Sequence, residues 1–179
     1  GQSSGVLPVS IVSDKNDSGD KFPVAHTVDG VAALRFDAKD YPGVLRAVDD
    51  LQNDIHAVTN QKPMKLTNEP STAYEIVIGT LGYSKVVDQL VSSKKINVQT
   101  LKGRWESFVI ATIPSPKAGT KQCLAIIGSD KRGTIYGIYE LSQQLGVSPW
   151  YWWADVPVKK RTEAFVKSGY YASGEPKVK

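Results

Sequence analysis

The chain has 179 residues, of which 41% are hydrophobic and 22% are charged, and its net charge is +4. This is the composition of an ordinary globular protein, and the length predicts one compact domain. The single cysteine, Cys123, excludes an internal disulfide. Because it lies in an apolar run, we expect a buried core residue and not a nucleophile.

Three classes of function are disfavoured by residue type and spacing. The two histidines, His26 and His56, are far apart, and no Cys/His spacing fits a metal site. No apolar stretch approaches the roughly 20 residues needed to span a bilayer. The basic residues are scattered except for 159–161, whereas nucleic-acid binding favours a denser basic stripe. We therefore expect no metal site, no membrane span and no nucleic-acid partner.

The N-terminal part predicts two strands separated by a polar loop. β-Branched residues in 5–12 indicate a first strand, and the polar run 13–21 indicates a loop. The segment 30–36 follows the turn signal Asp29-Gly30 and predicts a second strand.

The segment from Asp40 to Pro63 is the clearest helix in the sequence. Asp40 is the expected N-cap, and Pro42 suits the first turn. Apolar residues then recur at steps of three and four, which places on one face Val44, Leu45, Val48, Leu51, Ile55 and Val58. On the solvated side we expect Asp49, Asp50 and Asp54.

The later elements alternate between strand and helix. A buried strand is predicted over 74–80 and a short helix over 84–93. Strands over 105–113 and 122–129, joined by a turn-rich link, predict an antiparallel hairpin. A last helix follows and ends at Gly146. The predicted fold is an α/β (α+β) sandwich, with a mixed β-sheet flanked by helices.

The sequence IIGSDKRGTIYG, where the last strand leads into the last helix, allows two interpretations. A helix N-terminus after a glycine resembles a phosphate-binding loop. However, the glycine spacing fits neither G-x-x-x-x-G-K-[ST] nor G-x-G-x-x-G. We therefore favour a structural role, in which Ser129 or Asp130 caps the helix. Gly133 and Gly137 would then let the helix lie close to the sheet.

The acidic residues do not form a recognisable catalytic set. Glu140 and Asp155 lie nearest to an aromatic run in the sequence, and we expect them to be solvated or ion-paired. No G-x-S-x-G elbow and no Ser/His/Asp arrangement is present.

The aromatic run WYWWADVP contains three of the four tryptophans. Its side chains are Trp150, Tyr151, Trp152 and Trp153, followed by Asp155. Exposed tryptophans would suit stacking against sugar rings. A run stiffened by prolines at both ends would equally suit a joint covered by another domain, or a local core. The residues leave these interpretations open.

A long motif resembles a known family. The run GSDKRGTIYGIYELSQQLGVSPWYWWADVPVKKR is similar to the N-terminal region of the family 115 glycoside hydrolases, the xylan α-glucuronidases. It contains Asp130, Arg132, Gly133, Tyr136 and Gly137, for which we expect structural roles. DAKDYPGVLRAVDDLQNDI and EIVIGTLG are also similar to that family. A looser form of the motif marks the small domain ahead of the barrel in β-hexosaminidases, and the resemblance implies a fold like that domain.

The resemblance also implies a division of the chain. Residues 1–20 would form an N-terminal segment with a first strand and a polar loop. Residues 21–147 would form a mixed-sheet accessory domain. Residues 148–179 would form an aromatic joint and linker leading to a (β/α)₈ catalytic barrel, which needs roughly 250 residues.

The implied function is that of a non-catalytic accessory domain of a xylan α-(4-O-methyl)glucuronidase. The catalytic residues of the family would lie in the barrel, so no catalytic, cofactor-binding or metal-binding residue is assigned. The implied partners are the barrel and glucuronoxylan, the implied location is extracellular or periplasmic, and no cofactor is expected. The alternative is a free-standing carbohydrate-binding module that stacks sugars on Trp150, Trp152 and Trp153.

Overall fold

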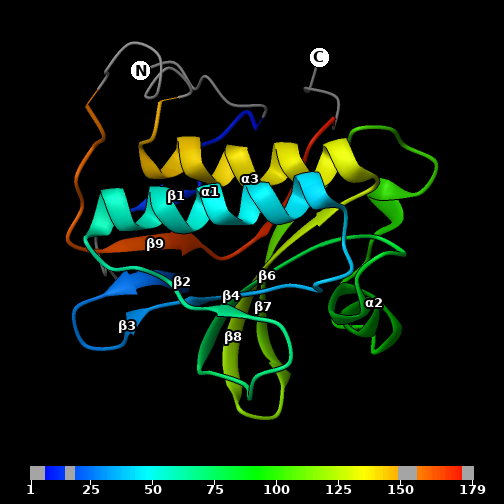
Figure 1. Ribbon diagram of the computed structural model, residues 1–179, viewed down its shortest axis with the longest axis horizontal. Coiled ribbons are helices and arrows are strands. Elements are labelled where there is room, and N and C mark those ends of the chain that lie inside the picture. The colour runs from blue at the N-terminus through cyan, green and yellow to red at the C-terminus, as the bar shows by residue number, and fades with distance from the viewer. Residues whose placement is uncertain (1–6, 15–18, 149–156, 175–179) are drawn as a thin grey trace.

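The computed structural model describes residues 7–14, 19–148 and 157–174. Three helices and two β-sheets form layers (Figure 1). The helices are α1 (Pro42–Thr59), α2 (Lys85–Ser92) and α3 (Lys131–Leu145), with a short 3-10 helix η1 (Gln99–Leu101). The strands are β1 (Val12–Ser13), β2 (Lys21–His26), β3 (Gly30–Val31), β4 (Ala33–Arg35), β5 (Lys65–Leu66), β6 (Tyr74–Thr80), β7 (Phe108–Lys117), β8 (Thr120–Gly128), β9 (Ala164–Lys167) and β10 (Tyr170–Ala172).

The larger sheet has the strand order β10-β7-β8-β6-β4-β5. β8, β6, β4 and β5 run parallel to one another, whereas the β7–β8 hairpin and the β10–β7 pair are antiparallel. The predicted hairpin and the strand over 74–80 are therefore confirmed. The mixed α/β fold expected from the sequence is confirmed as well.

The smaller sheet is antiparallel and has the order β1-β9-β2-β3. It lies beside the larger sheet and beneath α1 and α3 (Figure 1). The two sheets share one apolar core with the inner faces of α1 and α3. A second, smaller core fills the opposite face of the larger sheet, where α2 packs. Cys123 is fully buried in this second core, and burial raises the pKa of its thiol to about 12, as expected for a core residue.

Several strand predictions need correction. The single strand expected over 30–36 is two strands, β3 and β4, which belong to different sheets. Of the strand expected over 5–12, the described part contributes only the start of β1, at Val12. The segment 148–179 was expected to be joint and linker, yet within it β9 joins β1 to β2 and β10 pairs with β7. β2 was also not predicted, because its strand KFPVAH contains a proline and has no clear alternation.

The N-cap predicted for α1 is wrong. Tyr41 occupies the cap position without a side-chain cap hydrogen bond. The buried carboxylate of Asp40 instead accepts hydrogen bonds from the backbone N–H groups of Tyr41 and Thr80, at 2.8 and 3.0 Å. Asp40 therefore ties the start of α1 to the end of β6, although burial raises the pKa of its carboxyl group.

Candidate functional site between α1 and α3

Two glycines bring α3 against the larger sheet. A Cβ atom added at Gly133 would lie 2.1 Å from the carbonyl oxygen of Ser107. One added at Gly137 would lie 2.8 Å from Cγ2 of Ile126 and 3.2 Å from Cβ of Phe108. Neither position has room for a side chain, so these glycines allow α3 to pack closely against β7 and β8.

Asp130 is the N-cap of α3 and also holds the preceding loop. Its Oδ1 accepts from the Gly133 N–H at 2.8 Å, and its Oδ2 accepts from the Glu106 N–H at 2.9 Å. Glu106 has a φ of 52°, a left-handed conformation that costs free energy in a residue with a side chain. One carboxylate therefore stabilises both the first turn of α3 and a strained loop residue.

Arg132 and Tyr136 lie on the exposed side of the first turns of α3. The Tyr136 hydroxyl is 3.3 Å from Oε1 of Glu106, and Nη1 of Arg132 is 3.8 Å from the same oxygen. In the same loop Trp105 is 84% exposed and precedes β7, so its predicted place in a strand is wrong. These side chains make contacts at the surface.

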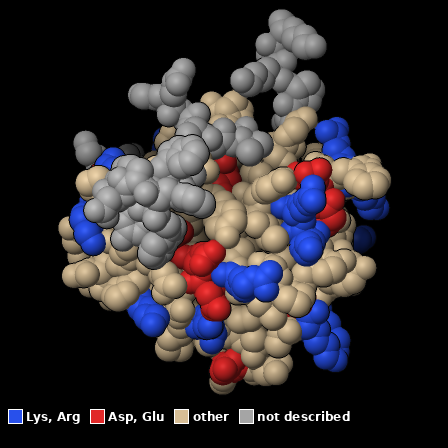
Figure 2. Space-filling model, turned by 45° about the horizontal axis from the view of Figure 1, so that its top comes forward, with Lys and Arg blue, Asp and Glu red and all other residues tan. Residues whose placement is uncertain are grey.

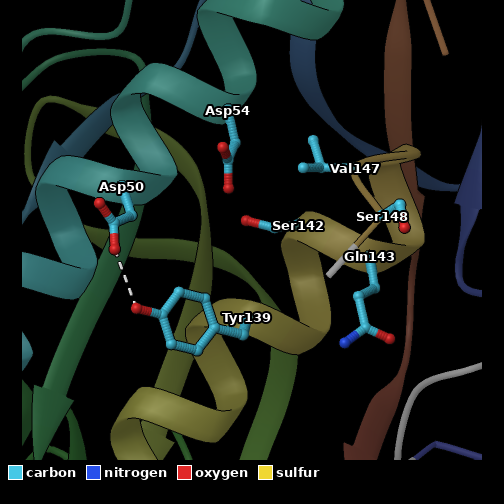
Figure 3. A pocket seen from close by; sticks show the side chains of 7 residues that line it. All are labelled: Asp50, Asp54, Tyr139, Ser142, Gln143, Val147 and Ser148. Atoms are coloured by element: carbon cyan, nitrogen blue, oxygen red, sulfur yellow. Dashed lines mark hydrogen bonds between the residues drawn. The ribbon is translucent and has the colours of Figure 1, made fainter. Parts of the chain in front are cut away.

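A pocket of about 340 Å³ opens where α1 and the C-terminal half of α3 meet, and we call it the α1–α3 pocket. Figure 3 shows that one wall comes from α1 and the other from α3 and the residues after it. The described residues that line it are Asp50, Asp54, Tyr139, Ser142, Gln143, Val147 and Ser148.

Asp54 is the deep acidic group of this pocket. It is only 6% exposed, so its predicted position on the solvated side of the helix is wrong. Burial raises the pKa of its carboxyl group to about 6; the nearby Ser142 hydroxyl lowers the pKa and the charge of Asp50 raises it further. The helical pattern did not reveal this, because Asp54 precedes the core residue Ile55 and turns toward α3 and not toward the solvent.

Ser142 faces Asp54 from the opposite wall. Its residue is 3% exposed, and its Oγ has no hydrogen-bond partner of regular geometry in the described part of the chain. In Figure 3 the Ser142 hydroxyl and the Asp54 carboxylate point into the same space.

Asp50 and Tyr139 form the outer part of the pocket. The Tyr139 hydroxyl donates a hydrogen bond to Oδ2 of Asp50 over 2.9 Å (Figure 3). Burial, together with this hydrogen bond, raises the pKa of Tyr139 to about 12, so the phenol keeps its proton. Asp50 is exposed, as the sequence predicted.

Glu140 does not line this pocket. It is 2% exposed, so of the two expected environments, solvated or ion-paired, the solvated one is wrong. Its Oε2 accepts from the Gln144 side chain at 3.1 Å and from the Leu7 N–H at 3.4 Å. Glu140 thus anchors the N-terminal segment to α3.

The residues of the aromatic run, Trp150, Tyr151, Trp152, Trp153 and Asp155, lie outside the described residues. The run begins shortly after Ser148, which lines the α1–α3 pocket. Its role therefore stays a prediction.

A second cavity, of about 490 Å³, lies beside the buried Arg35 on the α2 side of the larger sheet. The Arg35 guanidinium is fully engaged, because it donates to Glu75 and to the backbone carbonyls of 67, 69 and 70. Burial alone would raise the pKa of Glu75, but hydrogen bonds from Arg35, Thr72 and Lys117 outweigh it and the pKa is lowered. This network is saturated and stabilises the sheet edge, so it is a weaker site candidate.

Other kinds of site find little support in the described chain. Within it, no group of three or more His, Cys, Asp or Glu side chains is arranged to hold a metal ion. None of the helices described is both long and apolar enough to cross a bilayer. Figure 2 shows that the described side chains on the face carrying α1 and α3 alternate between acidic and basic, without a continuous basic stripe.

Comparison with known families decides the domain type. The model of the glycosyl hydrolase family 67 N-terminus matches residues 28–141. The chain belongs to this family of glycosyl hydrolase N-terminal domains. The match includes α1, the central strands and α3 as far as Leu141, and of the residues that line the α1–α3 pocket it includes Asp50, Asp54 and Tyr139. The expected resemblance to the N-terminal domain of a glycoside hydrolase is thereby confirmed at this level.

Solved structures resemble this N-terminal domain to different degrees. A family GH115 4-O-methyl-α-glucuronidase, BtGH115A, with specificity for decorated arabinogalactans, is 32% identical, with a TM-score of 0.63. The alignment covers 79% of this chain and 17% of that enzyme. The GH20 β-N-acetylhexosaminidase of Streptomyces coelicolor A3(2) is 12% identical over 94% of this chain and 26% of its own, with a TM-score of 0.48. No curated protein sequence matches the domain significantly.

Proposed function

We propose that the chain is a non-catalytic accessory domain of a family 115 α-glucuronidase. The observation that supports this most strongly is the 32% identity to BtGH115A over 79% of the chain. The domain spans only 17% of that enzyme, which is consistent with a supporting part of a larger protein. The catalytic barrel of that larger protein would be its main partner.

The parent enzyme would act on α-linked glucuronic acid, or its 4-O-methyl form, on plant polysaccharides outside the cytoplasm. Xylan is the substrate that the sequence motif implies, whereas the related structure is described as specific for decorated arabinogalactans. The proposed substrate class is therefore the uronic acid side chain, with glucuronoxylan as the first polymer to test.

The α1–α3 pocket does not have the arrangement expected of a glycosidase site. In most glycosidases, two carboxyl groups lie on opposite sides of the glycosidic bond that is cleaved. Asp50 and Asp54 are one turn apart on the same helix, so they present their carboxylates from one wall. The described residues of the facing wall contribute hydroxyl and amide groups and no second acid. This favours the accessory role over a complete small enzyme.

The aromatic run distinguishes the accessory domain from the alternative, a carbohydrate-binding module. If Trp150, Trp152 and Trp153 contact the barrel, then glucuronoxylo-oligosaccharides should produce no saturable change in tryptophan fluorescence. Stacking on sugars would give saturation that Trp152→Ala abolishes. The matched control is Trp105→Ala, which removes an exposed tryptophan elsewhere. Saturation that is lost in Trp152→Ala and retained in Trp105→Ala would contradict the accessory role.

A further inference from the structure

The α1–α3 pocket presents lone pairs and negative charge to whatever enters it. Asp54 supplies a buried carboxylate, and Asp50 supplies a second one at the mouth. The Tyr139 hydroxyl donates a hydrogen bond to Asp50, which leaves the lone pairs of its oxygen free to accept one. No basic side chain of the described chain forms an ion pair with either aspartate.

The Ser142 hydroxyl, whose contact with Asp54 falls short of a regular hydrogen bond, is an independent indication of a ligand. Buried hydroxyl groups nearly always have a hydrogen-bond partner, because an unmade bond costs free energy. Ser142 Oγ is buried, lacks a regular partner among the described residues, and points into the pocket beside Asp54. A group that donates hydrogen bonds to both Asp54 and Ser142 would satisfy it.

The volume and lining of the pocket indicate which kind of group could bind there. A volume of about 340 Å³ is far larger than a bare metal ion needs. The Tyr139 ring and Val147 supply apolar surface on either side of Asp54 and Ser142 (Figure 3). An aliphatic stem with a flat cationic head that carries several donors fits this arrangement.

We propose that the α1–α3 pocket is a binding site for a guanidinium group, held by Asp54 and Ser142 with the Tyr139 ring and Val147 along its stem. A planar guanidinium can donate two parallel bonds to one carboxylate and keep further donors for a hydroxyl. A primary ammonium would offer the charge without this fork. The site is independent of whether the parent protein is a glucuronidase.

The test is a titration of this 179-residue chain with capped tripeptides, followed by NMR of backbone amides on α1 and α3. Acetyl-Gly-Arg-Gly-amide should bind with a Kd on the order of 1–10 mM at low salt, and the matching lysine peptide should bind several-fold more weakly. Asp54→Asn should weaken arginine binding by about ten-fold, and Ser142→Ala by about three-fold. Asp20→Asn, at an exposed aspartate outside the pocket lining, is the control and should change nothing.

Free arginine is a third probe, which distinguishes an arginine side chain of another polypeptide from a small-molecule ligand. Free arginine carries its own carboxylate, which the two aspartates would repel at short range. Tighter binding of the capped peptide indicates a side chain from a neighbouring polypeptide, and tighter binding of free arginine indicates a small-molecule ligand; either supports the guanidinium site. Equal binding of lysine and arginine peptides, binding unaffected in both Asp54→Asn and Ser142→Ala, or no saturation at all would each overturn the proposal.

Discussion

At the level of single residues, the burial of Asp54 has a direct consequence for stability. Burial raises the pKa of its carboxyl group to about 6 in the folded chain, from an ordinary value of 3.8. The folded state therefore holds the proton more tightly than the unfolded state, and stability is lost as the pH rises through the folded pKa. The loss of unfolding free energy arises from ionisation of the buried Asp54. It is therefore absent below about pH 4 and reaches its full size above about pH 7.

Asp54→Asn should remove this penalty. We expect the free energy of unfolding to rise by about 1–2 kcal/mol near pH 8 and to change little near pH 4. This rise is smaller than the raised pKa alone would give, because solvent in the pocket screens the charge. Urea denaturation at both pH values measures the change in the free energy of unfolding, and Asp20→Asn, which removes an exposed charge, is the control. A loss of stability in Asp54→Asn near pH 8 would show that the carboxylate is instead needed to hold the helices together.

Asp130 should be more important than an ordinary N-cap. Loss of a helix cap costs about 1 kcal/mol, and loss of the hydrogen bond to the strained Glu106 should add about 1 kcal/mol. We therefore expect Asp130→Ala to lower the free energy of unfolding by about 2 kcal/mol and Asp130→Asn, which keeps one acceptor, by about half as much. Equal stability of both variants and the parent, measured by urea denaturation, would contradict the double role.

At the level of elements, the close approach of α3 to the sheet can be tested at Gly133. An added methyl group would meet the backbone carbonyl of Ser107, which cannot rotate away. We expect Gly133→Ala to cost more than about 2 kcal/mol of unfolding free energy, although alanine favours helix formation. Gly43→Ala in α1 is the control, because its added carbon would meet only side-chain ends, the nearest at 3.3 Å. Thermal unfolding gives the melting temperature of both variants. Equal melting temperatures for Gly133→Ala and the parent chain would refute the close contact.

The helices of this chain could be predicted from the sequence, and the edge strands could not. Apolar spacing and end signals gave the body of α1 and the C-cap of α3 at Gly146, because these depend on nearby residues. β2, β9 and β10 are short and exist through pairing with strands far away in the sequence. For the same reason the α1–α3 pocket was missed: Asp54 and Ser142 meet only after two distant helices pack, and no local pattern distinguishes a buried aspartate from an exposed one.

At the level of the whole molecule, the C-terminal strands make the fold one unit. β9 lies between β1 and β2 in the smaller sheet, and β10 covers the β7 edge of the larger sheet. Both sheets therefore depend on residues 164–172, which follow the aromatic run. In the sequence, the aromatic run therefore lies between α3 and β9 of the same fold.

The central claim is that this domain supports a glucuronidase without cleaving sugars itself. The most direct measurement is the release of 4-O-methylglucuronic acid when the purified chain is incubated with glucuronoxylan and with a decorated arabinogalactan. We expect no release above the buffer blank from either polymer, with no difference between the parent chain and Asp54→Asn. Steady turnover by the parent chain that Asp54→Asn abolishes would contradict the claim and identify the α1–α3 pocket as an active site.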